Sequence, residues 1–241
     1  FNIITNGYKK YFLNFLGLDN YIEYKFNKTL SNLDAINFIE KILVKQLNIK
    51  KIIVGRDFRF GKDRKGDTTL LKKLSNKYHY KLHIIDHVKN KKTNLKFSSS
   101  IIRKDINEGS FEKVFEALGR HWFMQGKIIK GDQKARLINF PTANIKPGNH
   151  ILPKKGVYCV KVILEGKTYK GIANFGERPT VKGLNLLLET HLFEFNSNIY
   201  GKQLTVEFLT FIRPEKKYKD FKILTNQILK DVKTAKKYHK I

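Results

Sequence analysis

The chain has 241 residues, of which 41% are hydrophobic and 29% are charged; this composition supports one large folded domain or two smaller ones and excludes a disordered tail. No run of 18 apolar residues occurs, so a membrane-spanning helix is not expected, and the single cysteine, Cys159, excludes a disulfide framework and a cysteine-based zinc site. With no signal-peptide pattern at the start, these features favour a reducing, cytoplasmic location.

The formal net charge of +27 is spread along the chain. Residues 1–118 carry 24 basic and 12 acidic side chains, and residues 119–241 carry 24 and 9. Only 8 of the 48 basic residues are arginines, the residue that most often reads base edges. Because a nucleic-acid footprint is usually concentrated on one face, we expect a solvated basic surface that attracts anions in general, and no specific nucleic-acid partner.

The first half of the chain alternates between helical and strand-like patterns. The predicted elements are a helix over residues 33–47, a strand over 51–54, a helix over 68–78, a strand over 81–86 and, after a polar loop at 89–96, helical residues 101–118. Helix and strand in this order are typical of an α/β domain with a parallel sheet.

After Gly119 the pattern changes to short alternating segments separated by turn residues. The predicted strands cover residues 127–130, 157–164, 168–174, 187–195 and 204–211, and an amphipathic helix near 219–237 follows them. Such strands predict a small antiparallel barrel. We therefore place a domain boundary near residue 118, with domains at 1–118 and 119–241.

The segment from Gly126 to Asn144 is the densest unusual stretch. Gly126 and Gly131 flank an apolar strand, and Lys134 and Arg136 follow closely. A loop of this kind can bring backbone N–H groups and cations to a phosphate. By spacing alone, a lysine-rich hairpin is the alternative.

Thr142 and Asn144 lie two residues apart, directly after Pro141. On an extended chain their side chains point to the same side. Two neutral oxygens can help to hold a magnesium ion that takes its other ligands from water and substrate phosphates. An ordinary polar turn is the alternative.

Glu189 is a carboxylate within the otherwise apolar segment 186–193. Burial raises the pKa of a carboxyl group and suits a general base. The alternative is a carboxylate that points to solvent on an alternating strand. His191 shares the face of Glu189, and we expect it to be a structural histidine.

Residues 119–241 resemble the riboflavin kinase domain of bacterial bifunctional riboflavin kinase/FAD synthetases. The matching pieces, in order, are Gly131–Asp132, Phe140–Asn144, Gly156–Tyr158, Ala173–Gly176, Arg178–Thr180, Leu188–Phe193, Tyr200–Gly201 and Arg213–Glu215. No single piece is specific, but their order across the whole domain is. The resemblance implies a six-stranded antiparallel barrel with a C-terminal helix.

The same resemblance implies ATP-dependent phosphorylation of riboflavin to FMN. Thr142 and Asn144 would help to place Mg²⁺ and ATP, and Glu189 would deprotonate the terminal ribityl hydroxyl. The basic loop from Gly126 to Arg136 would cover the nucleotide. These roles fit phosphoryl transfer, which depends mostly on positioning and charge neutralisation.

Residues 1–118 resemble part of the FMN adenylyltransferase domain of the same family, a Rossmann-like nucleotidyltransferase fold. Residues 54–61 match the segment that lines its flavin and nucleotide site, which implies flavin contacts for Asp57, Phe58 and Phe60. In the barrel half, the resemblance implies a flavin contact for Arg213.

The segment Ser98–Arg103 matches the family's serine pair followed by arginine. The match implies contacts of Ser99, Ser100 and Arg103 with ATP phosphates. Hydroxyls and N–H groups at a helix start, with one arginine, can form an anion site. On the residues alone, an N-cap is the simpler interpretation.

The family's first strand and its His-x-Gly-His element have no match in this chain. None of the seven histidines forms that element, and the match begins several dozen residues into the family pattern, as in an N-terminally truncated chain. We expect FAD synthesis only where that segment is present. Ala135 and Asn139 stand where the family has glycine, and they motivate the alternative of a flavin- or nucleotide-binding scaffold with little turnover.

Overall fold

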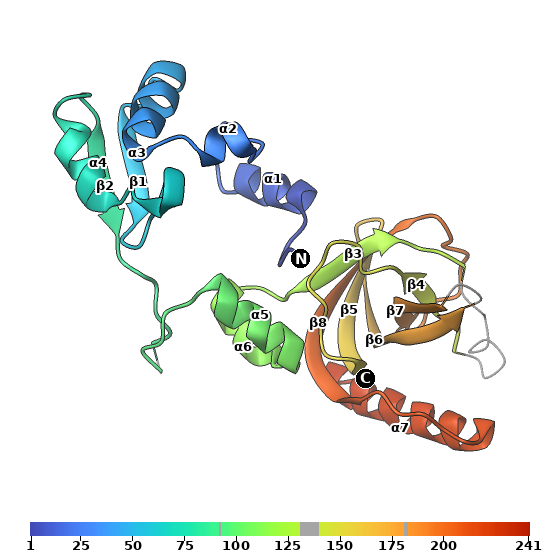
Figure 1. Ribbon diagram of the computed structural model, residues 1–241. Helices are drawn as coiled ribbons and strands as arrows, with labels where there is room; N and C mark the ends of the chain where they lie inside the picture. Colours follow the sequence, from blue (N-terminus) through green and yellow to red (C-terminus); the bar gives the residue numbers. More distant parts are fainter. Residues whose placement is uncertain (92, 131–139, 181–182) are drawn as a thin grey trace. The chain divides into compact units, whose positions relative to one another are not determined.

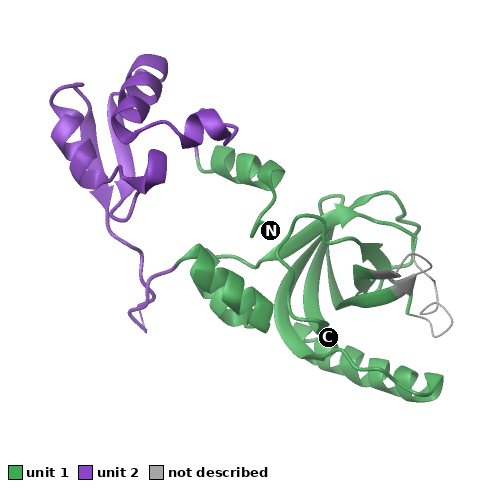
Figure 2. Ribbon diagram, in the orientation of Figure 1, with its two compact units in different colours: residues 1–16, 98–241 green, residues 17–97 purple. Residues whose placement is uncertain are grey.

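The computed structural model describes residues 1–91, 93–130, 140–180 and 183–241, in two compact units (Figure 2). Unit 1 comprises residues 1–16 and 98–241, and unit 2 comprises residues 17–97. The division differs from the boundary predicted near residue 118, because two helices before that point pack with the barrel. The assignment of residues 1–118 to an adenylyltransferase domain stays a prediction.

Unit 2 is a small α/β structure around two parallel strands. Its elements are α2 (Lys28–Ser31), α3 (Ala35–Asn37), a π-helical segment (Phe38–Gln46), β1 (Lys51–Gly55), a 3-10 turn (Lys62–Arg64), α4 (Thr68–Ser75) and β2 (Lys81–Ile85). Strands β1 and β2 pair in parallel with Lys51 opposite Lys81, which confirms the predicted parallel arrangement. Ile39 and Leu71 are fully buried in the core of this unit.

Unit 1 contains the predicted antiparallel barrel, with six strands. They are β3 (Phe123–Lys127), β4 (Ala143–Ile145), β5 (Gly156–Leu164), β6 (Lys167–Thr180), β7 (Gly183–Leu192) and β8 (Gln203–Pro214), paired in the order β3-β8-β5-β6-β7-β4. The two edge strands approach each other where Ile129 N donates to Asn144 O at 2.9 Å. The strand predicted at residues 127–130 is observed at residues 123–127, as β3. The short strand β4 was not predicted.

Among the described residues, four helices belong to unit 1. They are α1 (Asn6–Phe15), which the sequence patterns did not predict, α5 (Ser99–Glu108), α6 (Phe111–Leu118) and the predicted C-terminal helix α7 (Phe221–His239). Helix α7 lies across the outside of β5, β6 and β8 (Figure 1). None of the described helices combines the length and apolar character needed to cross a bilayer.

The barrel sheet is covered on both faces, because successive side chains of a strand point to opposite sides. Tyr158 and Val160 of β5 point into the barrel core, whereas Val157 and Cys159 point outward to Val232 and Ala235 of α7. This double covering explains why residues 157–160 of β5 are apolar at successive positions.

An aromatic cluster joins α6 to the barrel. The Phe111 ring lies 5.1 Å from Phe208 and 5.5 Å from Tyr158, measured between centroids, and Trp122 lies 5.0 Å from Phe208. Trp122 Nε1 also donates to Ile3 O at 2.7 Å, which fastens the start of the chain to the same cluster. These contacts explain why residues 98–118 and the first residues belong to unit 1.

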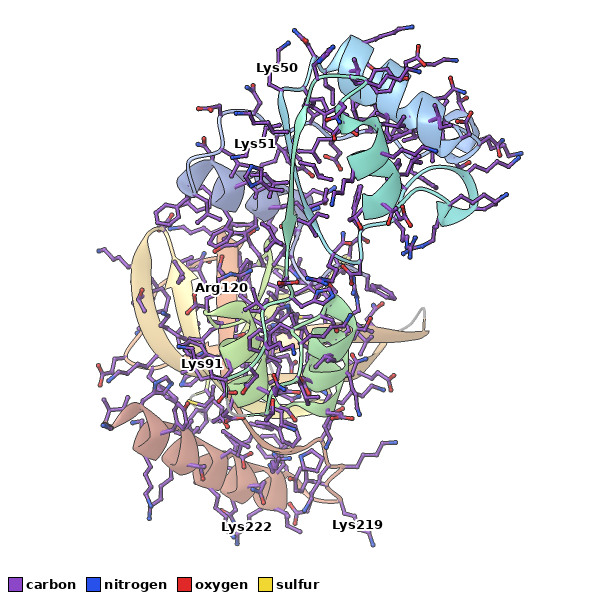
Figure 3. The ribbon with its side chains drawn as sticks, turned by 90° about the vertical axis from the view of Figure 1, so that its left-hand side faces the viewer. Lys50, Lys51, Lys91, Arg120, Lys219 and Lys222 are labelled. Atoms are coloured by element: carbon purple, nitrogen blue, oxygen red, sulfur yellow. The ribbon has the colours of Figure 1, made fainter. Side chains whose placement is uncertain are left out.

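Basic side chains project from both units, as the even distribution of charge along the sequence predicted. Lys50, Lys51 and Lys91 belong to unit 2, and Arg120, Lys219 and Lys222 belong to unit 1 (Figure 3). Lys219 and Lys222, at the start of α7, extend outward into solvent.

Replacing Phe111 with alanine is expected to lower the free energy of unfolding of unit 1 by about 3–5 kcal/mol, because the side chain is only 1% exposed and packs against three other aromatic rings. Phe115→Ala on the same helix is the control: Phe115 is 42% exposed, and the expected loss is about 1 kcal/mol or less. Urea unfolding followed by the fluorescence of Trp122, the only tryptophan, compares them. Equal losses would contradict the role given to Phe111.

Candidate functional site

A cavity of about 540 Å³ lies in unit 1 between the outer face of the barrel and the start of α7. Its walls come from the segment before β4, strands β4 to β7, the segment after β8, and α7. Four of the predicted site residues line it together: Thr142, Asn144, Glu189 and Arg213. They are up to 71 positions apart in the sequence, and the barrel brings them to one place.

Strand register places the polar residues of the cavity in one row. Asn144 on β4 lies directly opposite Glu189 on β7, and Glu189 lies opposite Asn174 on β6. Thr142 and His191 lie two residues along from members of this row, and therefore share its face. The expected common side for Thr142 and Asn144 agrees with both residues lining the cavity.

Asn144 is 4% exposed, and its side chain is only partly satisfied. Nδ2 donates to Thr142 O at 3.4 Å, whereas Oδ1 is buried with no hydrogen-bond partner among the described residues. A buried acceptor of this kind is costly unless something binds it. The described residues include no group of three or more His, Cys, Asp or Glu side chains placed to hold a metal ion. Neutral oxygens such as Asn144 Oδ1 are therefore the candidate metal ligands.

The side chain of Glu189 is 25% exposed, so its burial is partial, and it forms an ion pair with Arg178. Nε of Arg178 on β6 donates to Oε2 of Glu189 at 3.0 Å, and Nη2 of Arg178 donates to the same oxygen. Nη1 of Arg178 donates to Glu215 Oε1 at 2.9 Å. The candidate base is thus held by a guanidinium shared with a second carboxylate.

His191 ties the turn before β4 to strand β7. Its Nδ1 lies 2.8 Å from Pro141 O, and its ring packs edge-on against Phe140 and Phe193. Burial lowers the pKa of His191 below its ordinary value; the hydrogen bond to Pro141 opposes the shift and the charge of Lys236 adds to it. A neutral imidazole with a donor at Nδ1 fits the structural role expected for this residue.

Arg213 lines the cavity with its guanidinium bound to the buried Asp231 of α7. Nε lies 2.9 and 3.0 Å from the two carboxylate oxygens, and Nη2 lies 2.6 Å from Oδ2. Gln227 Nε2 donates to the same carboxylate at 2.8 Å. Burial alone would lower the pKa of Arg213, but Asp231 raises it above its ordinary value. The flavin contact predicted for Arg213 stays a prediction.

Gly126 lies on β3 outside the cavity lining. A Cβ at this position would stand 3.1 Å from the Ile145 Cβ, so the glycine permits the close approach of β3 and β4. Its predicted phosphate contact stays a prediction. Gly131, Lys134 and Arg136, together with Ala135 and Asn139, lie outside the described residues.

The candidates from the first half of the chain divide between the units. In unit 2, Phe58 and Phe60 stack with centroids 5.4 Å apart and line a second hollow of about 700 Å³, while Asp57 stands outside that lining and contacts Lys96 at 3.5 Å. The hollow is aromatic, and Arg59 also lines it.

In unit 1, Ser98 caps α5, because its Oγ accepts from Ile101 N at 3.3 Å. This agrees with the N-cap interpretation. Ser99 and Ser100 are exposed in the first turn of the helix, and Arg103 is half-buried one turn further along. Phosphate contacts of these three residues stay a prediction.

Arg178, Glu215 and Asp231 were not among the predicted site residues. Arg178 is 11 positions from Glu189 and 37 from Glu215, so no local pattern connects them. The available signal was a charged residue before Pro179 in an apolar neighbourhood and a second one after Pro214. That signal marks the two motifs, but it does not show that their side chains meet.

Comparisons with known proteins agree on a family. The family described as riboflavin kinase matches residues 118–239, and the one described as FAD synthetase matches residues 1–100. A relative from Haemophilus influenzae named bifunctional riboflavin kinase/FMN adenylyltransferase is 39% identical over 95% of this chain and 74% of its own length. The Escherichia coli K12 relative of the same name is 34% identical over 92% of this chain and 71% of its own length.

A solved structure supports the fold. It is described as a macrolide-efflux protein from Streptococcus pneumoniae, is 28% identical, and matches with a TM-score of 0.87 over 97% of this chain and 75% of that chain. The likeness is one of fold along nearly the whole sequence.

We expect His191 to titrate below the ordinary value of about 6.5. As the pH falls, the unfolded chain therefore binds this proton at a higher pH than the folded chain does. Neutral His191 contributes its full stability above the unfolded-state pKa of about 6.5, and this contribution is lost as the pH falls through the lower folded-state pKa. NMR titration of the imidazole measures the pKa, and unfolding at pH 7.5 and pH 5 measures the loss. His191→Gln should remove only part of the pH-dependent loss of stability, because the pKa values of His121 and His150 are also lowered. Titration of His191 above its ordinary value would contradict this.

Proposed function

The chain belongs to the bifunctional riboflavin kinase/FMN adenylyltransferase family, and on that premise we propose that Glu189 is the general base with which its riboflavin kinase domain phosphorylates riboflavin. The observation that carries the proposal is the convergence of Glu189, Asn144 and Thr142 on one cavity. ATP and riboflavin are the substrates, and FMN and ADP are the products.

The reaction is an in-line transfer of one phosphoryl group. A carboxylate oxygen of Glu189 accepts the proton of the terminal ribityl hydroxyl while the ribityl oxygen forms a bond to the γ-phosphorus of ATP. The bond between the γ-phosphorus and its bridging oxygen breaks, and its electron pair leaves with ADP. Little other covalent chemistry is required, so positioning and neutralisation of charge supply most of the catalysis.

The cavity suits an amphipathic ligand of flavin size. Its volume of about 540 Å³ is within the ordinary range for small-molecule sites. Val157, Ile172 and Val232 supply an apolar wall beside the polar row that contains Asn144 and Glu189. An isoalloxazine ring against the apolar wall and a ribityl chain toward Glu189 would match these two sides.

We propose Thr142 and Asn144 as the residues that hold Mg²⁺ with the nucleotide. The support is Asn144 Oδ1, a buried acceptor without a donor among the described residues. Magnesium prefers oxygen ligands and usually keeps several waters and substrate phosphates, so two neutral protein oxygens suffice. When bound, the ion supplies charge neutralisation at the phosphate oxygens. In the same proposal, Gly126, Gly131, Lys134 and Arg136 contact the nucleotide, and Arg213 contacts the flavin.

The first half of the chain carries the FAD synthetase match. We propose Phe58 and Phe60 as flavin contacts there, on the support of the aromatic hollow in unit 2, with Asp57 beside them. Ser99, Ser100 and Arg103 are proposed to contact ATP phosphates at the start of α5. Adenylylation of FMN also needs the strand and the His-x-Gly-His element that find no match in these 241 residues.

Incubation with riboflavin, ATP and Mg²⁺ should yield FMN and no FAD, with the flavins separated by chromatography. Glu189→Gln should lower kcat by about 10²–10⁴-fold, because the amide cannot accept the proton. Glu165→Gln, at an exposed turn where Glu165 pairs with Lys202, is the matched control and should retain full activity. Flavin binding without FMN from the wild-type chain would support the scaffold alternative instead. FAD as a product would show that other residues serve the triphosphate.

Asn144→Ala should raise the Mg²⁺ concentration for half-maximal rate by about 10-fold or more, because the substitution removes one ion ligand. Asn196→Ala, an exposed amide in the turn after β7, should leave that concentration unchanged. Melting curves check that the Asn144→Ala variant is folded. An unchanged Mg²⁺ requirement in a folded Asn144→Ala protein would exclude Asn144 as a ligand.

A further inference from the structure

Arg178 stands beside the proposed base in the wall of the cavity. Its side chain is 29% exposed, and it lies between the carboxylates of Glu189 and Glu215, which are 25% and 27% exposed. An arginine near a nucleotide site is usually expected to bind phosphate, because its planar fork matches phosphate oxygens. The hydrogen bonds of Arg178 argue for a different role.

All five N–H groups of the Arg178 guanidinium have acceptors within the protein. Nε donates to Glu189, and Nη1 donates to Glu215 Oε1 at 2.9 Å and to Glu177 O at 3.0 Å. Nη2 donates to Glu189. We assign the Asn174 amide the orientation in which its oxygen faces Arg178, because it then accepts from Nη2 and its nitrogen donates to Gly156 O at 3.3 Å. No donor is left over for a phosphate.

The two bonds to Glu189 end on the same oxygen. Both Nε and Nη2 of Arg178 donate to Oε2, while Oε1 has no hydrogen-bond donor among the described residues. A carboxylate oxygen that already accepts two charge-assisted bonds is a poor proton acceptor compared with its free partner. The Arg178–Glu189 ion pair therefore makes Oε1 and Oε2 of Glu189 different, although the two oxygens of a free carboxylate are equivalent.

We infer that Arg178 is a positioning residue that occupies Oε2 of Glu189 and leaves Oε1 as the atom that accepts the ribityl proton, and that it does not bind the phosphates of ATP. This inference rests on the proposed role of Glu189 as the base. It adds the atom that reacts and the residue that selects it.

Glu215 holds the arginine in this position, and Gly176 makes room for Glu215. A Cβ at position 176 would stand 2.1 Å from Glu215 Oε1, so any side chain there displaces the carboxylate. Gly176 lies in strand β6 and has no positive φ, so alanine fits its backbone. Gly176→Ala is therefore expected to fold while moving Glu215 away from Arg178.

The charge balance supports a fixed arginine. Burial lowers the pKa of Arg178, but the hydrogen bonds and charges of Glu189 and Glu215 outweigh burial and raise it above its ordinary value. The other charged or titratable residues that line the cavity are His191, Arg213, Lys216, Tyr218, Lys219, Asp220 and Asp231. Arg213 and Asp231 are paired with each other. Arg178 is thus the cation bonded directly to Glu189 among the described residues.

The experiment compares Arg178→Gln, Arg178→Lys and the wild type by kcat and by KM for ATP. Arg178→Gln should lower kcat by about 10–100-fold with KM for ATP unchanged. Arg178→Lys keeps the positive charge but not the planar pair of N–H donors that bonds Oε2 of Glu189, so kcat should stay below that of the wild type while KM for ATP is again unchanged.

Gly176→Ala and Glu215→Gln test the same network from the other side. Both should lower kcat less than Arg178→Gln does, because Arg178 keeps its bonds to Glu189. Lys155→Gln is the control: Lys155 pairs with the Glu177 side chain at 2.6 Å, outside the cavity lining, and its loss should change nothing. Melting curves identify any variant that fails to fold, and kcat and KM are then compared among the variants that do fold.

A raised KM for ATP with unchanged kcat in Arg178→Gln would overturn the inference in favour of a phosphate contact. If the wild-type chain makes no FMN, the proposed function fails, but the pairing is still measurable. The carbon-13 chemical shift of the Glu189 carboxyl, assigned with Glu189→Gln and measured at one pH, should differ between the wild type and Arg178→Gln, because the variant lacks the two hydrogen bonds to Oε2. Identical chemical shifts in the two proteins would overturn the inference independently of activity.

Discussion

The antiparallel register of strands β4, β7 and β6 is the constraint on which the site depends. It sets Asn144, Glu189 and Asn174 directly opposite one another in a single row. Because side chains alternate with a period of two, a slip of one residue would turn the whole row into the barrel core. Arg178 lies four residues beyond Asn174 on the same face, so one register places the proposed base, its positioning residue and the proposed ion ligand together.

Covering both faces of the sheet gives this row its environment. The inner face packs the barrel core, and the outer face packs Val232 and Ala235 of α7 beside the cavity. The Arg213–Asp231 ion pair joins the end of β8 to the same helix. Replacing either residue with a neutral one would leave the charge of its buried partner uncompensated. The polar row is therefore accessible from the cavity, while the residues next to it on each strand point into the barrel core.

The site depends on ion pairs whose partners lie on different strands. Glu189 is oriented by Arg178, Arg178 is held by Glu215, and Glu215 occupies the space that Gly176 leaves open. Each member is only partly buried, so the network is a means of orientation more than a source of stability. A base held in one rotamer before substrate binds loses less entropy at the moment of reaction.

The sequence by itself determined the element types, the two kinds of fold and four of the polar residues that line the cavity. Strand 157–164, the helix near 219–237, Thr142, Asn144 and Glu189 all follow from periodicity, turn residues or the order of short motifs. The tertiary structure decided the rest: the pairing of Arg178 with Glu189 and Glu215, the burial of Asp231 under Arg213, and the packing of Phe111 that places α6 with the barrel. Periodicity is a property of neighbouring residues, whereas these contacts join residues 11 to 97 positions apart and exist only once strand register and helix packing are set.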